Sequence, residues 1–201
     1  MITDLKIGAA RRLEPRETAP SIEDPLRLKR LCLGDVAALQ ALIDAYWRPL
    51  LNYAARILDD RDAAEDTVQD GFIRLWERRR EWEPNAPARV ILYTIVRNLA
   101  LNGRKSVKLR NRSDVRLRVP RPTAPTAPED ALQADELDAA MRAAIDALPP
   151  RRREVLLLAK FDGLSRNEIA ELLGIAPQTI ANHLALAVAE LRDALRPFLA
   201  P

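Results

Sequence analysis

A cluster of capping and turn signals near the C-terminus places the tightest constraint on the fold. Ser165 is followed three residues later by Glu168, the capping-box spacing with which many α-helices begin. Gly174 is suited to ending that helix, and Pro177 to the first turn of the next one. A short capped helix, a glycine turn and a longer helix predict a helix-turn-helix, with the small residue Ala170 where the two helices cross.

The second helix of this motif has a polar start and an apolar stripe. Its first turns carry Gln178, Thr179, Asn182 and His183, positions that reach base edges in the major groove when such a motif binds DNA. On an isolated helix these side chains would be ordinary surface, but within the complete motif we favour DNA contact. The residues expected to be buried are Ile180, Leu184, Leu186 or Ala187, Val188 and Leu191.

Composition extends the helical prediction to the whole chain. The 201 residues are 48% hydrophobic but only 4% aromatic, with six glycines, and Ala, Leu, Arg and Glu dominate. These proportions favour helices over a β-sandwich or barrel. We therefore expect an all-α protein, with length for two small domains.

Charge and proline divide the chain into four parts. Residues 104–128 hold eight Lys and Arg against one acid, together with four prolines, which is typical of an extended linker. The run could lie along a polyanion or simply stay solvated. Residues 129–201 reverse the balance, with twelve acids against eight Lys and Arg. We expect a loose arm at 1–24, helical domains at 25–103 and 129–201, and the basic linker between them.

The second helix expected in the N-terminal domain has one apolar and one acidic face. Ala64, Val68, Phe72 and Leu75 recur at helical spacing. The opposite face could be a solvated surface with intrahelical ion pairs, or a docking surface for a basic partner. This acidic ridge consists of Asp62, Glu65, Asp66, Gln69 and Asp70.

A further helix is expected to open at Pro87, after a short loop that contains Trp82. Its buried stripe is predicted as Ile91, Leu92, Ile95 and Leu99. The other side mixes residue types that stack on bases, bond their edges and bind phosphates. On composition alone, the interpretation of Tyr93 and Trp82 as core or boundary residues is favoured, because aromatic side chains are usually buried. The polar side is predicted as Tyr93, Arg97, Asn98, Leu101, Asn102, Arg104 and Lys105.

Several classes of function find no support in the residues. One cysteine, Cys32, and one histidine, His183, cannot form an intrachain disulfide or a Cys/His metal cluster. There is no phosphate-cradling glycine loop and no Ser/His/Asp set, so we expect no enzyme, no metal and no cofactor. No apolar run is long enough to span a bilayer and no signal peptide is visible, so we expect a cytoplasmic protein without membrane insertion.

Two motifs together resemble a known family. Residues 64–76 read AEDTVQDGFIRLW, and residues 148–155 read LPPRRREV and lead into Gly163-Leu164-Ser165 and the helix-turn-helix. The chain resembles a bacterial sigma-70 family factor of the extracytoplasmic-function group. The first motif is similar to conserved region 2, which continues through IVRNLA at 95–100, and the second to region 4. The resemblance covers about residues 26–199.

The resemblance implies core RNA polymerase, through its β′ clamp and β flap, and promoter DNA as partners, with an anti-sigma factor as a further candidate. It aligns the linker with the segment that threads toward the RNA exit channel. The implied polymerase-binding residues are Asp62, Glu65, Asp66, Gln69 and Asp70. The implied minus-ten contacts are Trp82, Asn85, Arg97, Asn98 and Asn102. The implied minus-thirty-five contacts are Pro177, Gln178, Thr179, Asn182 and His183.

The alternative is a transcriptional regulator that acts without polymerase, since residues 164–184 also resemble the DNA-binding end of two-component response regulators. The acidic ridge discriminates between the two, because a simple operator binder has no need of it. A net charge of −4 in residues 129–201 predicts weak binding of DNA by this part alone, because phosphate contacts supply most non-specific affinity.

Overall fold

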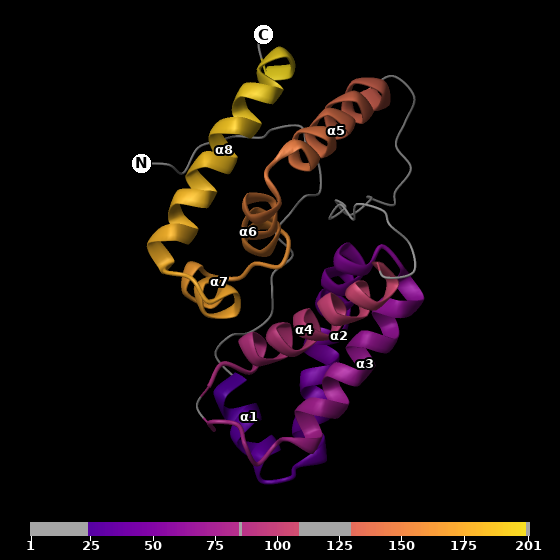
Figure 1. Cartoon of the computed structure of the whole chain (residues 1–201), viewed down its shortest axis with the longest axis vertical. Helices are drawn as coiled ribbons and strands as arrows, with labels where there is room; N and C mark the ends of the chain where they lie inside the picture. Colours follow the sequence, from indigo (N-terminus) through magenta and orange to yellow (C-terminus); the bar gives the residue numbers. More distant parts are fainter. Residues whose placement is uncertain (1–23, 85, 109–129, 200–201) are drawn as a thin grey trace.

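The computed structural model describes residues 24–84, 86–108 and 130–199, and within them it contains eight α-helices and no strand. The chain forms two helical units in direct contact, with the N-terminal unit at the bottom of Figure 1 and the C-terminal unit at the top. The expectation of an all-α protein is confirmed. Residues 1–23 of the arm expected at 1–24, Asn85 and residues 109–128 of the expected linker lie outside the described residues.

The N-terminal unit is built from α1 (Asp24–Cys32), α2 (Val36–Leu58), α3 (Arg61–Glu77) and α4 (Ala88–Lys108). Aspartates delimit the first long helices. The Asp35 side chain accepts the amide of Ala37 at 2.8 Å to cap α2, which ends at Asp59 in the left-handed conformation, φ 57°. Asp60 then caps α3. Helices α2, α3 and α4 pack pairwise, and α1 covers α2 and α4.

Helix α3 comes especially close to α4 at Gly71. A Cβ atom on Gly71 would lie 2.8 Å from Cγ2 of Val96, which is fully buried. Glycine therefore permits the contact between the two helices that fixes the position of α4. The core around it includes Leu42, Leu50, Val68, Leu75 and Leu92.

The C-terminal unit is built from α5 (Asp130–Ala147), α6 (Pro150–Lys160), α7 (Arg166–Leu173) and α8 (Pro177–Leu199). Helices α5, α6 and α7 all pack on α8. A small second core lies between α5, α6 and α8 and consists of Ile145, Leu148, Leu156, Leu157 and Ala187.

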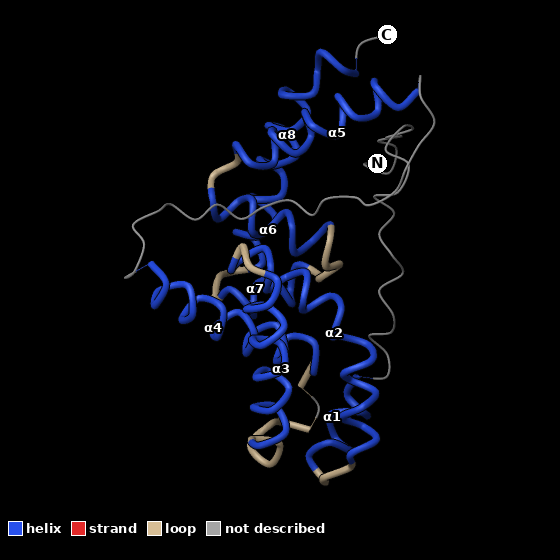
Figure 2. The backbone as a smooth tube through the Cα atoms, turned by 90° about the vertical axis from the view of Figure 1, so that its right-hand side faces the viewer, coloured by secondary structure: helices blue, strands red, loops and turns tan. Residues whose placement is uncertain are grey.

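The two units share an apolar core. Helix α4 packs against α7, and the main cluster of buried residues continues from the N-terminal helices into the C-terminal unit. Figure 2 shows α7 beside α4 in a second orientation. The C-terminal members of this cluster include Val155, Leu158, Leu164 and Ile169.

Tyr93 is fully buried, in agreement with its interpretation as a core residue, and the centre of its ring lies 5.1 Å from that of Tyr53 on α2. The structure differs from the sequence expectations at three places. Leu186 and Val188 are exposed, since the buried stripe of α8 runs through Ile180, the alternative Ala187, and Leu195. Helix α1 was not predicted, and α4 runs on to Lys108, into the segment expected as linker.

In the described part of the chain, no single helix has the length and hydropathy needed to cross a membrane. The pair α7 and α8 passes that test only when the two are taken together, and they are bent by 110°.

Candidate nucleic-acid and polymerase interfaces

The acidic ridge is displayed on the outer face of α3. Its members are exposed, whereas Ala64, Val68 and Leu75 on the opposite face are fully buried. Arg61 approaches Glu65, with Nε 3.5 Å from Oε1, in an exposed pair that is worth little in water. The ridge residues are Asp62, Glu65, Asp66, Gln69 and Asp70, and Ile73, 45% exposed, adds an apolar side chain further along α3.

Two of the arginines that follow the ridge, Arg78 and Arg79, contact side chains outside the ridge. Arg78 bonds Glu81, with Nε 2.8 Å from Oε2, and its guanidinium lies 5.5 Å from the centre of the Trp82 ring. The guanidinium of Arg79 lies 4.4 Å from the centre of the Trp76 ring. The negative charge of the ridge is therefore left to face solvent rather than being neutralised by these cations.

The loop between α3 and α4 holds Trp82 in a fixed orientation. The Trp82 indole N–H donates to the carbonyl of Leu75 at 3.1 Å, and the Cys32 thiol approaches the Trp82 carbonyl at 3.7 Å. The ring is half-buried with Arg78 over it. Stacking of a base on Trp82 therefore has to use the free part of the ring or displace Arg78. Asn85, expected in the same site, lies outside the described residues.

Helix α4 separates the polar residues expected to meet DNA into two groups. Asn98 and Asn102 are exposed. Arg97 is half-buried and points at the C-terminal unit, where its Nε donates to Glu154 Oε1 at 3.0 Å.

The helix-turn-helix forms as the sequence predicts. Ser165 and Glu168 make both bonds of the capping box, and Gly174 ends α7 in the left-handed conformation with φ 64°. Helix α8 begins at Pro177. The cap and the glycine turn therefore set the angle at which α8 leaves α7.

The first turns of α8 present an amide pair to solvent. Gln178 and Asn182 are exposed, and Gln178 Nε2 donates to Asn182 Oδ1 at 3.2 Å. This bond aligns two amides of the kind that pair with adenine edges. Pro177 and Thr179 are also exposed, whereas His183 is half-buried.

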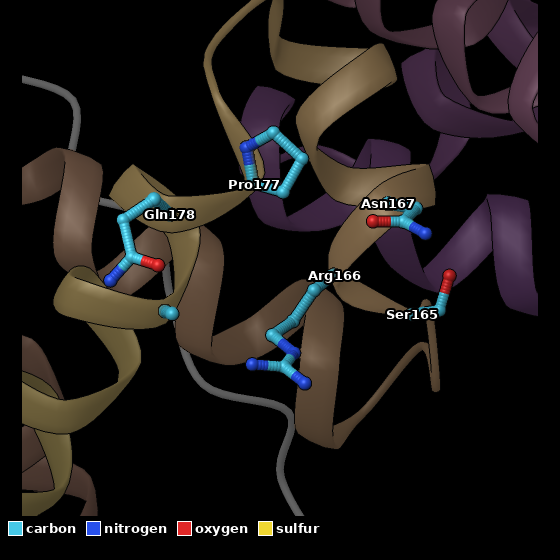
Figure 3. Close-up of a pocket in the computed structure, with 6 residues that line it drawn as sticks. Ser165, Arg166, Asn167, Pro177 and Gln178 are labelled. Carbon is cyan, nitrogen blue, oxygen red and sulfur yellow. The ribbon is translucent and has the colours of Figure 1, made fainter.

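An open hollow of about 300 Å³ lies between the starts of α7 and α8, and Figure 3 shows Arg166 and Gln178 on its wall. Arg166 is an exposed cation beside the predicted recognition helix that sequence reasoning missed. The sequence signal for this placement was its position directly after the Ser165 cap, at the first residue of α7. The hollow is lined by Ser165, Arg166, Asn167, Pro177, Gln178 and Ala181.

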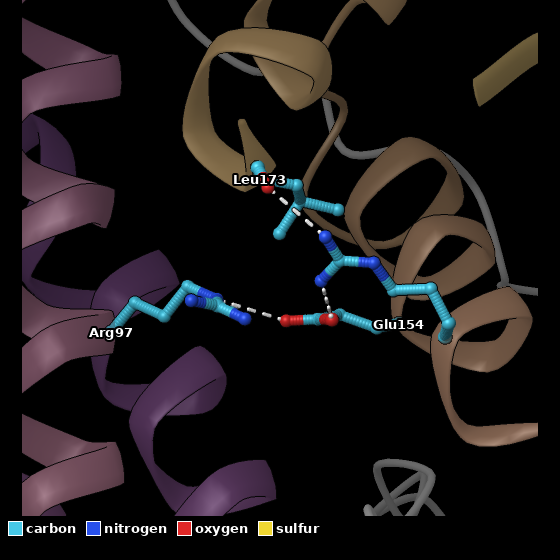
Figure 4. A network of polar contacts seen from close by, with 4 residues as sticks. Arg97, Glu154 and Leu173 are labelled. Atoms are coloured by element: carbon cyan, nitrogen blue, oxygen red, sulfur yellow. Dashed lines mark hydrogen bonds and ion pairs between the residues drawn. The ribbon is translucent and has the colours of Figure 1, made fainter. Parts of the chain in front are cut away.

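A polar network between the two units was also missed. Glu154 accepts from Arg97 and, through Oε2, from Arg151 at 2.9 Å, while Arg151 also donates to the carbonyl of Leu173 at 3.0 Å (Figure 4). These bonds place one carboxylate between a guanidinium of each unit.

A second part of the network surrounds Asp162, in the turn between α6 and α7. Its carboxylate pairs with Arg56 of α2, and its carbonyl accepts from Arg89 of α4. Burial raises the pKa of Asp162 to about 6, with Arg56 and Arg89 opposing the rise. Burial also raises the pKa of Tyr93 well above its usual range. Among the described residues, no group of three or more His, Cys, Asp or Glu could hold a metal ion.

Comparisons with known proteins agree with this arrangement. Sigma-70 region 2 matches residues 42–110, and sigma-70 region 4 matches residues 138–191. The ECF RNA polymerase sigma factor SigL of Mycobacterium tuberculosis is 31% identical over 176 residues, which cover 85% of this chain and 96% of SigL.

Two solved structures share the fold. CnrH, determined in complex with the cytosolic domain of CnrY, has a TM-score of 0.61 at 20% identity and covers 87% of this chain and 97% of its own. The sigma factor RpoE of Bartonella quintana, determined with the anti-sigma factor NepR, has a TM-score of 0.60 at 20% identity and covers 78% and 96%. With both sigma regions matched in order, the chain belongs to the sigma-70 family and is an extracytoplasmic-function sigma factor, which acts in transcription initiation.

Proposed function

We propose that this sigma factor docks on core RNA polymerase through the acidic ridge of α3. The observation that carries the proposal is the exposure of all five ridge residues on one face of a helix whose other face is buried. A helix held this firmly presents its carboxylates in a fixed array, which suits recognition of a basic helical surface such as the β′ clamp coiled coil. A regulator that acts without polymerase has no use for such an array.

We propose two separate sites for promoter DNA. The exposed amides of Asn98 and Asn102 lie on α4 with Arg97, next to the loop of Trp82, and this surface is assigned to the minus-ten element. The amides of Gln178 and Asn182 at the start of α8 are assigned to the minus-thirty-five element. Asn85 remains assigned to the minus-ten site. The minus-thirty-five site also keeps Pro177, Thr179 and His183.

The protein is proposed to carry no catalytic chemistry of its own and to act in the cytoplasm, where core polymerase and promoters are found. The two solved relatives were determined with partner proteins, one of them named as an anti-sigma factor. We therefore include an anti-sigma factor among the proposed partners.

The test is retention of the full chain by core polymerase from the source bacterium. Reversing two ridge charges, Glu65→Lys with Asp70→Lys, should weaken binding roughly tenfold or more, because each attraction becomes a repulsion. Both residues are exposed, so the fold should remain within about 0.5 kcal/mol of wild type. The matched control reverses two exposed acids of the other unit, Glu136→Lys with Glu171→Lys. Equal retention of the ridge variant and wild type would show that the ridge does not dock.

A further inference from the structure

Acids of the C-terminal unit face arginines of the N-terminal unit across the contact between them. Glu154 bonds Arg97 at 3.0 Å, and Glu168 Oε1 lies 3.8 Å from Nη1 of Arg89. The carboxylate of Asp162 pairs with Arg56 at the centre of the contact. Part of the excess of acids in residues 129–201 is therefore explained by the structure, because several of these acids contact arginines of the other unit.

The Arg97–Glu154 pair is shielded from water and held in place. The two side chains are 20% and 15% exposed, so salt screens their attraction less than it screens a surface pair. Arg151 fixes Glu154 from the other side and is itself anchored to the carbonyl of Leu173 (Figure 4). Glu154 is thus held in place from within its own unit as well as by Arg97.

The chemistry of this contact is that of a DNA-binding site. A carboxylate accepts charge-assisted hydrogen bonds from a guanidinium much as a phosphate oxygen does. Arg97 lies on the surface of α4 assigned to the minus-ten element, and Arg89 lies at the start of the same helix. Arg97 is therefore engaged by a carboxylate where DNA would supply a phosphate, and Arg89 is held between Glu168 and the carbonyl of Asp162.

The closed arrangement is also incompatible with simultaneous contact to both promoter elements. Sites about 25 base pairs apart are separated by roughly 85 Å of duplex at 3.4 Å per pair. Here α7, which leads directly into the recognition helix, packs against α4. The roughly 20 residues between α4 and α5 can extend up to about 70 Å, so separation of the two units is within the reach of the chain.

We propose that Glu154 and Glu168 serve as internal substitutes for DNA phosphates and withhold α4 from nucleic acid until the two units part. The inference rests on the proposed function, since it takes α4 as the DNA-facing helix. It adds that the free chain restrains itself without any partner.

The test neutralises both acids in the full chain, as Glu154→Gln with Glu168→Gln. Glutamine keeps the shape of each side chain and is accepted at the third position of a capping box, so the start of α7 is preserved. The probe is a fluorescein-labelled single-stranded 30-mer of random sequence, titrated by anisotropy between 50 and 200 mM KCl. The matched control makes the same charge change at exposed positions, Glu136→Gln with Glu171→Gln.

The double variant should bind the probe roughly fivefold or more tightly than the control, within the usual range of coupling between sites. The slope of the logarithm of its binding constant against the logarithm of the KCl concentration should become more negative by about 1.4. Each freed arginine adds one phosphate contact, which contributes about 0.7 to this slope on a single strand. Small-angle X-ray scattering should show a larger radius of gyration. Affinity and slope equal to those of the control would overturn the proposal.

The single variants Glu154→Gln and Glu168→Gln keep the proposal testable if the double variant loses helix content. Each should change the slope by about 0.7, and no change in either would also contradict the proposal. Binding of the oligonucleotide requires no polymerase. Failure of wild type to bind core polymerase would therefore count against the proposed function only, and the comparison of oligonucleotide binding between variant and control would still decide this inference.

Discussion

Arg97 of α4 and Glu154 of α6 are joined by a 3.0 Å hydrogen bond, although they are 57 positions apart in the chain and belong to different units. Arg97 is a residue that the family resemblance assigns to promoter DNA. If α4 faces DNA as proposed, the bond to Glu154 means that this surface is completed only when the two units separate. The remaining part of that surface, Asn98 and Asn102, stays open to solvent.

The surface of α4 should be needed for melting but not for assembly. We expect Arg97→Ala with Asn98→Ala to form holoenzyme normally and to reduce melting of the minus-ten region, because the variant removes one cation suited to phosphates and one amide suited to base edges. This variant also removes the bond to Glu154, so it should not hold the two units together more tightly than wild type. A loss of promoter melting therefore cannot be explained by tighter contact between the units. Permanganate reactivity of promoter thymines measures melting, with Asn52→Ala on the exposed face of α2 as the control. Reactivity equal to that of the control would refute the assignment.

The amide pair of α8 should read bases upstream. Gln178→Ala or Asn182→Ala in the holoenzyme should relax preference at one or two positions, since a bidentate adenine contact contributes about 1–3 kcal/mol of discrimination. Core affinity should not change, because under the proposed function polymerase tethers this unit beside the DNA and supplies the affinity that its net acidic charge cannot. Selection from a promoter library checks this, and an unchanged upstream motif for both variants would contradict it.

Acidification should favour the closed form. Burial raises the pKa of Asp162 from 3.8 to about 6, although Arg56 of α2 and Arg89 and Tyr93 of α4 oppose the rise. A raised pKa means that the closed form binds the proton more tightly. The contribution of Asp162 protonation to closure is therefore complete below about pH 4 and is lost as the pH rises through about 6.

Between pH 7.5 and 5.5 the closing equilibrium constant should rise roughly fourfold, which X-ray scattering would detect as a smaller radius of gyration. The variant Asp162→Asn has no proton to gain and should show no such trend. A wild-type radius that stays constant or grows on acidification would exclude this role for Asp162.

Two glycine substitutions should have opposite effects on stability. In Gly71→Ala the new Cβ would meet Val96 at 2.8 Å, and overpacking of about 1–3 kcal/mol should outweigh the gain in helix propensity. In Gly103→Ala the nearest side-chain atom is Cδ2 of Leu58 at 3.7 Å, an ordinary contact, so alanine should stabilise α4 by about 0.5–1 kcal/mol. Urea denaturation measures both, and equal midpoints would contradict the packing argument.

Local signals explain which parts of the fold were predictable. The capping box of Ser165 and Glu168, the left-handed Gly174 and the opening Pro177 act within a few residues, so the sequence predicts the helix-turn-helix accurately. The acidic ridge was also predictable as one face of a helix, because helical spacing alone determines it.

Contacts between distant segments were not predictable in this way. Helical spacing places Tyr93 on the polar side of α4 whereas its aromatic character favours the core, and only the packing against Tyr53 decides that it is buried. The partners Arg56 and Asp162 are 106 positions apart, and no spacing rule joins them. Val188 was assigned to the core because apolar residues nearly surround this part of α8, so periodicity alone does not define its buried face.

Runoff transcription tests the central claim most directly. Core polymerase is combined with the full chain and with sheared genomic DNA, and transcripts are mapped to their start sites. The account predicts transcripts absent with core alone, whose start sites share one motif near minus ten and another near minus thirty-five. Transcription indistinguishable from that of core alone, with the chain retained by polymerase or not, would contradict the assignment of this protein as a promoter-specificity subunit.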